Sequence, residues 1–299
     1  MPSNYDLLIR QLKNGLFCLA LSYFLACTND EEIPDITKAP PQTGNNAIIE
    51  KLRTDYNLMA EEQIAVSNDE TVYAQFTDPV TRYAHGILGD QIEASRLVVV
   101  VNGAFHEIAL DNEYVFEDIR PRLFDVDSDG ELEFITIRTH IHEGAGIVIY
   151  KVVDNQLEEF AYVNEIGTPN RWLNIVTIYD LDQDGIVELA WIQTPHIGGI
   201  LKVAKIRDGK LLPTDEASQY SNHAIGETNL CLSELIQVGE QSIFYVPAQN
   251  REGITGFFYK DLKLNIHEEV SINVDFSKDL MSQYNFQKIV RTEDNCINP

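Results

Sequence analysis

Two copies of one short pattern, at residues 124–133 and 179–188, constrain the fold more than any other feature of this sequence. Each copy has an aromatic residue, three aspartates at alternate positions, a glycine and a closing glutamate. Downstream of the copies, apolar runs lead into the turn dipeptides Asp154-Asn155 and Asp208-Gly209. Short apolar runs around such dipeptides are typical of β-hairpins. The chain therefore contains a duplicated unit of short strands.

Weaker copies of this unit flank the two clear ones. Before them, Leu97–Val101 is a β-branched run that ends in the turn Asn102-Gly103. After them, Leu230–Val238 and Ser242–Val246 have strand composition around the turn Gly239-Glu240. Repeats of about 40 to 55 residues made only of short strands are typical of propeller blades with four strands each. The period-two pattern of apolar residues excludes a helical solenoid.

We therefore predict an all-β fold over residues 47–299, a β-propeller of about five four-stranded blades. In this prediction strands from the two ends of the domain pair and close the ring. Ile64–Val66 would complete a last blade that begins near Val270–Phe276. Only Ile48–Leu58 has a helical pattern, and it lies outside the repeats.

The acid-rich loops of the two clear copies are candidate metal sites. Oxygen ligands at positions 1, 3 and 5, a backbone carbonyl at 7 and a carboxylate at 9 can surround a hard cation, while glycine at 6 permits the sharp turn. The predicted ligands of the first loop are Asp125, Asp127, Asp129, the carbonyl of Glu131, and Glu133. Those of the second loop are Asp180, Asp182, Asp184, the carbonyl of Ile186, and Glu188.

The chemistry and the flanks of these loops indicate calcium. An EF-hand needs glutamate at position 12 between two helices, but Thr136 and Trp191 stand there and the flanks are strand-like. A site made only of oxygens suits calcium, whereas magnesium resists such complete dehydration. We therefore predict two calcium sites. The alternative is that both loops are solvated acidic turns.

The two units resemble the FG-GAP or VCBS repeats of integrin-like propellers, and the match is specific over residues 113–212. Segments 83–89, 115–130, 170–173 and 222–226 also resemble a group of bacterial proteins of this repeat class. The resemblance implies blades that hold calcium in the loop between their first and second strands. In that family the calcium is structural, and no catalytic activity is implied.

The N-terminus resembles a bacterial lipoprotein signal. Arg10 and Lys13 precede an apolar run that ends at Ala26, a small residue directly before Cys27. Phe24 departs from the leucine usual in such signals. The resemblance implies a signal peptide at residues 1–26, lipid on Cys27 and a flexible tether at 27–46. A plain secretory peptide and a buried N-terminal helix are the alternatives.

Residues after Cys27 indicate a location in the cell envelope. Thr28 stands where an inner-membrane retention signal would have aspartate, so we expect a lipid anchor in the outer membrane. The acidic tract Asp30–Glu32 resembles signals that send lipoproteins to the cell surface. With Cys18 in the signal and Cys27 lipidated, Cys231 and Cys296 remain for the domain, and their spacing leaves open whether they pair.

The charge of the chain limits its partners. Lysine and arginine number 22 against 47 aspartates and glutamates, which gives a net charge of -25. Such a chain repels phosphate backbones, so we exclude nucleic acid as a partner. Neutral glycans and neutral or basic proteins remain as the expected partners, and the membrane is reached through the lipid anchor.

Three histidines recur at one position of successive units. His85, His142 and His196 each end a strand ahead of the glycine that opens the next one, so they should lie at the end opposite the acidic loops. Arg171 and Trp172 are expected to edge the same face. Three converging imidazoles suit a transition metal or an acidic ligand. The alternative is that each histidine supports its own turn, and that Trp172 belongs to the core.

The sequence favours a binding protein over an enzyme. It contains no Gly-x-Ser-x-Gly elbow, no His-Glu-x-x-His motif, no Walker loop and no dinucleotide glycine pattern. We therefore expect a calcium-stabilised binding or scaffolding lipoprotein of the cell envelope. A hydrolase or lyase with its site on the histidine face is the alternative.

Overall fold

The computed structural model of the protein describes residues 46–59 and 63–285. The expected signal peptide, the lipidated Cys27, nearly all of the expected tether and Cys296 lie outside these residues. Cys231 is buried. No helix in the described ranges is long and apolar enough to cross a membrane.

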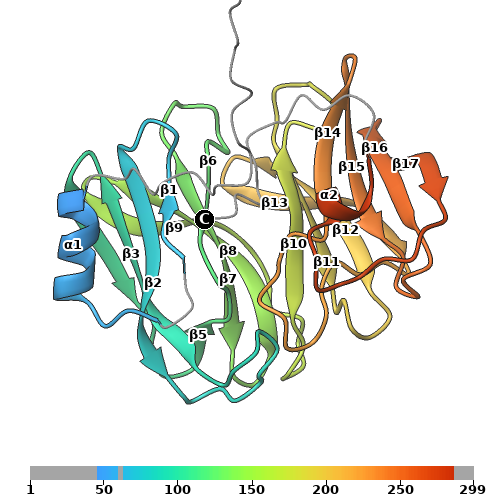
Figure 1. Ribbon diagram of the computed structural model, residues 1–299. Helices are drawn as coiled ribbons and strands as arrows, with labels where there is room; N and C mark the ends of the chain where they lie inside the picture. The colour runs from blue at the N-terminus through green and yellow to red at the C-terminus, as the bar shows by residue number, and fades with distance from the viewer. Residues whose placement is uncertain (1–45, 60–62, 286–299) are drawn as a thin grey trace, which may run out of the picture. The chain divides into compact units, whose positions relative to one another are not determined.

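Antiparallel strands dominate the described part of the chain and hold about half of its residues (Figure 1). The two helices described are α1 (Asn46–Asp55) and α2 (Leu280–Gln283). The first strands are β1 (Ala65–Val66), β2 (Val72–Val80), β3 (Glu93–Val101), β4 (Ala104–Ala109), β5 (Tyr114–Phe116), β6 (Arg122–Phe124), β7 (Glu133–His140), β8 (Gly144–Val153) and β9 (Gln156–Val163). The remaining strands are β10 (Leu173–Tyr179), β11 (Glu188–Gln193), β12 (Ile200–Arg207), β13 (Lys210–Ser218), β14 (Glu234–Val238), β15 (Gln241–Pro247), β16 (Ile254–Lys260) and β17 (Lys263–Val270).

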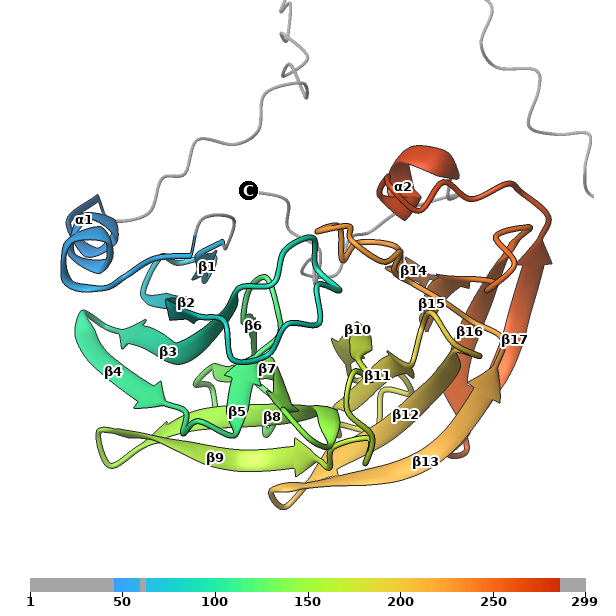
Figure 2. The ribbon, with the colours of Figure 1, turned by 90° about the horizontal axis from the view of Figure 1, so that it is seen from below.

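The strands form four antiparallel units of four strands each, namely β1–β4, β6–β9, β10–β13 and β14–β17. The short strand β5 pairs with both β3 and β7, so it joins the first two units into one nine-stranded sheet. Figure 2 shows the units following one another in chain order. The all-β prediction is confirmed at this level.

A two-residue turn joins the third and fourth strands of every unit. Positive φ at both central residues, which type I′ hairpins require, occurs at Asn102-Gly103, Asp154-Asn155, Asp208-Gly209 and Asp261-Leu262. The first three of these hairpins are the ones that the turn dipeptides predict. The fourth has leucine at a positive φ, which no dipeptide rule favours.

Apolar clusters lie between successive units. Phe76 and Leu97 of the first unit pack with Tyr150 of the second. Ile147 of the second unit packs with Trp191 of the third. The third and fourth units meet through a cluster that includes Val203 and Phe244. Each sheet is therefore buried on both faces, which explains why its central strands are continuous apolar runs.

The outer faces of the first and last units are covered by short segments of their own. Ile49 and Leu52 of α1 pack on β2 and β3. Val274, Phe276 and Leu280 pack on β14 and β15. The helical expectation for residues 48–58 is met by α1.

The predicted fifth blade and ring closure are not found among the described residues. Ala65–Val66 pairs with β2 of the first unit, and residues after Val270 do not continue as a strand. The physical reason is that Val274 and Phe276 bury their side chains as a cover over the fourth unit, at 3% exposure each. The described chain thus contains four units, and a count of about five is not confirmed.

Candidate functional site

The two acidic loops occupy equivalent places in the second and third units. The first loop connects β6 to β7, whose ends pair through Phe124 and Glu133. The second connects β10 to β11, whose ends pair through Tyr179 and Glu188. Because the glutamate is the first residue of its strand, its buried carboxylate is held by the sheet and closes the loop.

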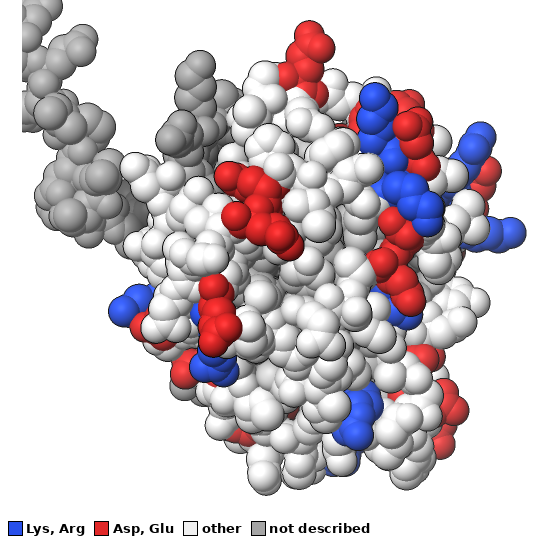
Figure 3. Space-filling model, turned by 90° about the vertical axis from the view of Figure 1, so that its right-hand side faces the viewer, with Lys and Arg blue, Asp and Glu red and all other residues white. Residues whose placement is uncertain are grey.

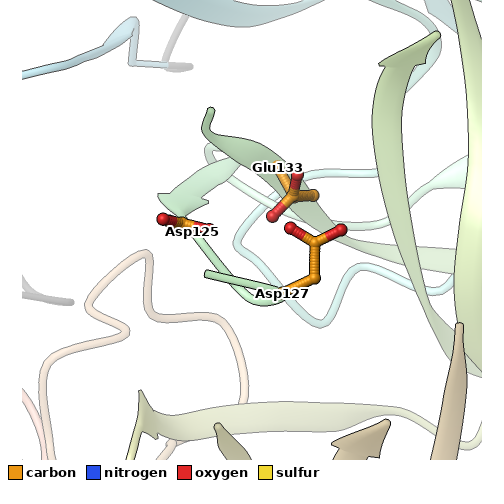
Figure 4. Close-up of side chains that lie close together, drawn as sticks. All are labelled: Asp125, Asp127 and Glu133. Carbon is orange, nitrogen blue, oxygen red and sulfur yellow. The ribbon is translucent and has the colours of Figure 1, made fainter. Parts of the chain in front are cut away.

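The same hydrogen bonds shape both loops. In the first loop, the two carboxylate oxygens of Asp125 accept from the backbone N–H of Asp129 at 3.1 Å and of Gly130 at 3.0 Å. Glu133 Oε2 accepts from the N–H of Val126 at 2.7 Å. Figure 4 shows the carboxylates of Asp127 and Glu133 facing one another, with Asp125 at the start of the loop.

The second loop repeats this arrangement almost atom for atom. Asp180 accepts from the N–H of Asp184 at 3.1 Å and of Gly185 at 2.9 Å. Glu188 Oε2 accepts from the N–H of Leu181 at 2.7 Å. The glycines have φ of 91° and 84°, a region that favours glycine, so their place in both loops has a backbone cause.

A lysine ammonium lies among the carboxylates of each loop, and the sequence reasoning missed both. Lys151 Nζ lies 2.6 Å from Asp127, 2.8 Å from Asp129 and 2.9 Å from Glu133. Lys205 makes the same three pairs, at 3.2 Å to Asp182, 2.7 Å to Asp184 and 2.9 Å to Glu188. In the second unit the signal was available, because Lys151 is the one charged residue of strand β8, whereas β12 carries Lys202 and Arg207 besides Lys205.

Burial and pairing shift the pKa values of these groups in opposite directions. Burial raises the pKa of Glu188 to about 7 and also raises that of Glu133. Burial alone would lower the pKa of Lys205 and Lys151, but their hydrogen bonds to carboxylates outweigh it and the pKa of each lysine is raised. Hydrogen bonding to Lys151 lowers the pKa of Asp129.

The donor set of each loop fits a hard divalent cation. One oxygen from each of Asp125, Asp127 and Glu133 lies within 4.8 Å of the others, and Asp180, Asp182 and Glu188 form the same group. Oxygens about 2.4 Å from a common centre would have such spacing. These are the only such acid, histidine or cysteine groups within the described ranges.

Not every predicted ligand belongs to these groups. Asp129 and Asp184 lie outside them, since one oxygen of each accepts from the N–H of residue 131 or 186 and the other pairs with lysine. The carbonyl oxygens of Glu131 and Ile186 stay predicted ligands.

A histidine cluster, defined as His85, His196 and His223 around Trp172 and Glu117, lies at the opposite end of the strands. Trp172 directly precedes β10, and His196 follows β11 by three residues. The indole stacks on His196 with ring centroids 6.2 Å apart and meets His223 at 4.7 Å. Trp172 Nε1 donates to the carbonyl of Glu117 at 2.9 Å.

Hydrogen bonds within the cluster fix its protons. His223 Nε2 donates to the carbonyl of Glu227 at 2.7 Å, so its Nδ1 is the acceptor for His196 Nε2 at 3.0 Å. His85 Nδ1 lies 2.6 Å from Glu117 Oε1, and the other carboxylate oxygen of Glu117 accepts from the hydroxyl of Thr139. Burial raises the pKa of Glu117, and the contact with His85 opposes this rise.

The other three members of the predicted ligand face have different surroundings. His142 is exposed, and its ring contact is with His140, at 5.8 Å, so it does not belong to the cluster. Trp172 is 2% exposed and belongs to the core, while Arg171 donates to the carbonyl of Asn170. Equivalent repeat positions share a backbone place but not the same neighbours. His223 was missed because it lies in the segment between units.

We expect acid to destabilise the domain through the histidine pair. Burial, followed by repulsion from His223 and His85, lowers the pKa of His196 to about 3, and burial lowers that of His223 to about 4. An unfolded histidine binds its proton near pH 6.5. The stabilisation is therefore complete above that pH and decreases as pH falls, by about 1.4 kcal/mol per pH unit for each group.

The measurement is a comparison of variants, because Glu93 acts in the opposite sense. Its burial raises its pKa to about 10, so acidification favours its folded form. Urea unfolding at pH 7 and pH 5 should show a smaller loss of stability in His196→Gln than in the wild type, by about 2 kcal/mol. The exposed His142→Gln is the matched control. Equal losses in wild type and His196→Gln would contradict the prediction.

Two exposed aliphatic side chains stand beside the cluster. Ile197 is 61% exposed and directly follows His196, and Ile225 is 69% exposed and lies two residues after His223. These are the most exposed large hydrophobic side chains among the described residues. Because His196 and His223 are hydrogen bonded, the two segments that carry these isoleucines meet at this end of the strands.

Comparisons with known proteins give distant likenesses. No family model and no curated protein matches the chain. The exotype rhamnogalacturonan lyase YesX aligns with 12% identity and a TM-score of 0.41, covering 73% of this chain and 51% of the lyase. Rhamnogalacturonan lyase YesW aligns with 14% identity and a TM-score of 0.38, covering 72% of this chain and 53% of the lyase. This chain therefore spans about half the length of either lyase. The complex of the fission yeast SREBP–SCAP binding domains aligns with 12% identity and a TM-score of 0.39, covering 86% of this chain and 69% of the matched chain. These TM-scores assign neither a fold family nor an activity.

Proposed function

We propose that the protein is a calcium-stabilised binding or scaffolding module of the bacterial cell envelope, held there by lipid on Cys27. The four units would be blades of a β-propeller, with the acidic loops at one end and the binding face at the other. The observation that carries the binding role is the pair Ile197 and Ile225, exposed beside a cluster whose histidines are already hydrogen bonded. Clustered exposed apolar side chains mark interaction surfaces.

A neutral or basic protein is the partner that this face favours over a neutral glycan. A sugar-binding platform needs an exposed aromatic face, but Trp172 is buried. Aliphatic side chains within a polar rim suit a protein interface. The net charge of -25 disfavours acidic partners. The side of the molecule drawn in Figure 3, which is the right-hand side of Figure 1, shows charged side chains in separate small groups with uncharged surface between them.

The binding role predicts that Ile197→Asp and Ile225→Asp remove partner binding without unfolding the domain. Immobilised wild type and variants would be incubated with detergent-solubilised envelopes of the source organism, and the captured protein identified and purified. That purified protein should bind wild type at least tenfold more tightly than either variant, since a charge in a desolvated contact costs more than about 1.4 kcal/mol.

The matched control is Ile266→Asp in β17. The wild-type side chain is 55% exposed there, and the residue is distant from the cluster residues along the chain. It should bind as wild type does. Equal affinity of Ile197→Asp and Ile266→Asp, with both folded, would place the binding surface elsewhere.

The calcium role predicts a small stabilisation. A cation that binds only the folded loops adds RT ln(1 + [L]/Kd) for each site, which is about 1 kcal/mol per loop at millimolar calcium for an extracellular-type site. Melts in excess calcium and in chelator should differ by a few degrees in the wild type. The difference should shrink in Asp127→Asn and vanish in Asp127→Asn/Asp182→Asn. Asp208→Asn, at an exposed hairpin turn, is the control.

The enzymatic alternative, a hydrolase or lyase on the same face, rests on the contact between His85 and Glu117. A buried carboxylate that orients an imidazole is a common arrangement for a general base. Turnover of an envelope polysaccharide by the wild type, lost in His85→Gln while Ile197→Asp retains it, would favour the enzyme.

A further inference from the structure

A lysine occupies the same place beside both acidic loops, and its position is as similar in the two units as the positions of the acids. Lys151 of β8 and Lys205 of β12 come from the third strand of their units and reach across the second strand to the loop. Their side chains are only 14% and 9% exposed. Phe160 and Tyr259 lie 5.5 and 5.8 Å from the two ammonium groups. Such burial leaves little water to screen the attraction.

The ammonium and a divalent cation need the same oxygens. Asp127 and Glu133 belong to the group whose oxygens are spaced for a metal, and both are paired with Lys151. In the second loop Asp182 and Glu188 are shared with Lys205 in the same way. A cation about 2.4 Å from these oxygens would lie no more than about 5 Å from the ammonium, where like charges in a partly buried site repel.

We propose that Lys151 and Lys205 are internal competitors for the divalent cation, so that each loop closes either on its own lysine or on the metal. The proposal rests on the calcium role proposed above and adds the residues that set its affinity. It gives the chain a domain that folds without calcium, because the lysine offsets part of the negative charge of the acids. A bound metal must displace the ammonium, so the loop responds only to high calcium concentrations.

The test uses lysine variants of residues 27–299 and calcium as the probe. Methionine has nearly the length of lysine and no charge, so Lys151→Met and Lys205→Met remove the competitor while keeping an apolar stem. Calorimetric titration should show calcium binding tighter by on the order of tenfold or more at the altered loop, the equivalent of one lost charge-assisted hydrogen bond. In chelator each variant should melt below the wild type, and its calcium-induced rise in melting temperature should exceed that of the wild type.

Two control variants separate charge from packing. Lys202→Met lies on the same strand as Lys205 and removes a partly exposed lysine 3.8 Å from Glu216, so its calcium affinity should equal that of the wild type. Lys205→Arg keeps the positive charge and should remain a weak calcium binder. If a methionine variant fails to fold in chelator, rescue of folding by calcium supports the proposal, and failure of rescue overturns it.

The outcomes distinguish this proposal from the calcium role itself. Unchanged calcium affinity in both methionine variants, with the wild type responsive, overturns the competition and leaves the calcium role standing. A wild type that ignores millimolar calcium, with variants that bind it, supports the competition and contradicts the calcium role in the native chain. No binding by any variant overturns both.

Discussion

Replacing Gly199 with alanine should lower the free energy of unfolding by more than about 3 kcal/mol. A Cβ atom added there would lie 1.6 Å from the carbonyl oxygen of Tyr220, a backbone atom that cannot rotate away. Both N–H groups of Gln219 and Tyr220 donate to the carbonyl of Gly199, so the two segments cannot separate without breaking these bonds. The melting temperature should fall by roughly 10 °C, and urea unfolding measures the loss of free energy.

The neighbouring Gly198 provides the control. Its φ is 78° and nothing lies within 4 Å of an added Cβ, so Gly198→Ala pays only the backbone cost of about 1 to 2 kcal/mol. The close approach recurs at Gly146 with Val163 and at Gly253 with Val270. A Gly199→Ala protein as stable as Gly198→Ala would mean that the strand does not approach Tyr220 so closely.

The hairpin turns are a part of the fold that the sequence could predict, because they follow simple backbone rules. Asn102-Gly103, Asp154-Asn155 and Asp208-Gly209 predict their hairpins because those residues tolerate positive φ. Leu262 has no such preference, and its φ of 61° is imposed by the pairing of β16 with β17. The apolar pattern alone also gave a wrong prediction near residue 274, where it indicated a strand. A strand and a covering segment bury the same kinds of side chain, so the pattern does not distinguish them.

The acidic loops were predictable because the acids lie close together in the sequence. Their lysine partners lie more than twenty residues from the paired aspartates, on a strand that the fold brings beside the loop. A buried lysine in an apolar strand signals an unidentified anion, but it does not say which one. The sequence predicts the membership of the histidine cluster only in part for a related reason, since repeat spacing selects His142, which lies outside the cluster, and overlooks His223.

Replacing Trp172 with alanine should cost about 3 to 5 kcal/mol, the usual loss for a large buried aromatic side chain. The residue is 2% exposed in the cluster that joins the second and third units. Its loss would also admit water to the histidine pair. Burial is the main reason that the pKa of His196 is as low as about 3, so this pKa should rise toward its ordinary value, measurable by NMR titration.

Trp172→Phe separates packing from hydrogen bonding. It keeps an aromatic ring but loses the Nε1 donor to the carbonyl of Glu117, which should cost about 1 to 3 kcal/mol. A ligand-facing tryptophan predicts a different pattern, in which alanine leaves stability within about 1 kcal/mol and reduces only partner affinity. Since the indole is buried while Ile197 and Ile225 are exposed, we expect Trp172 to hold the binding face in place and the isoleucines to contact the partner.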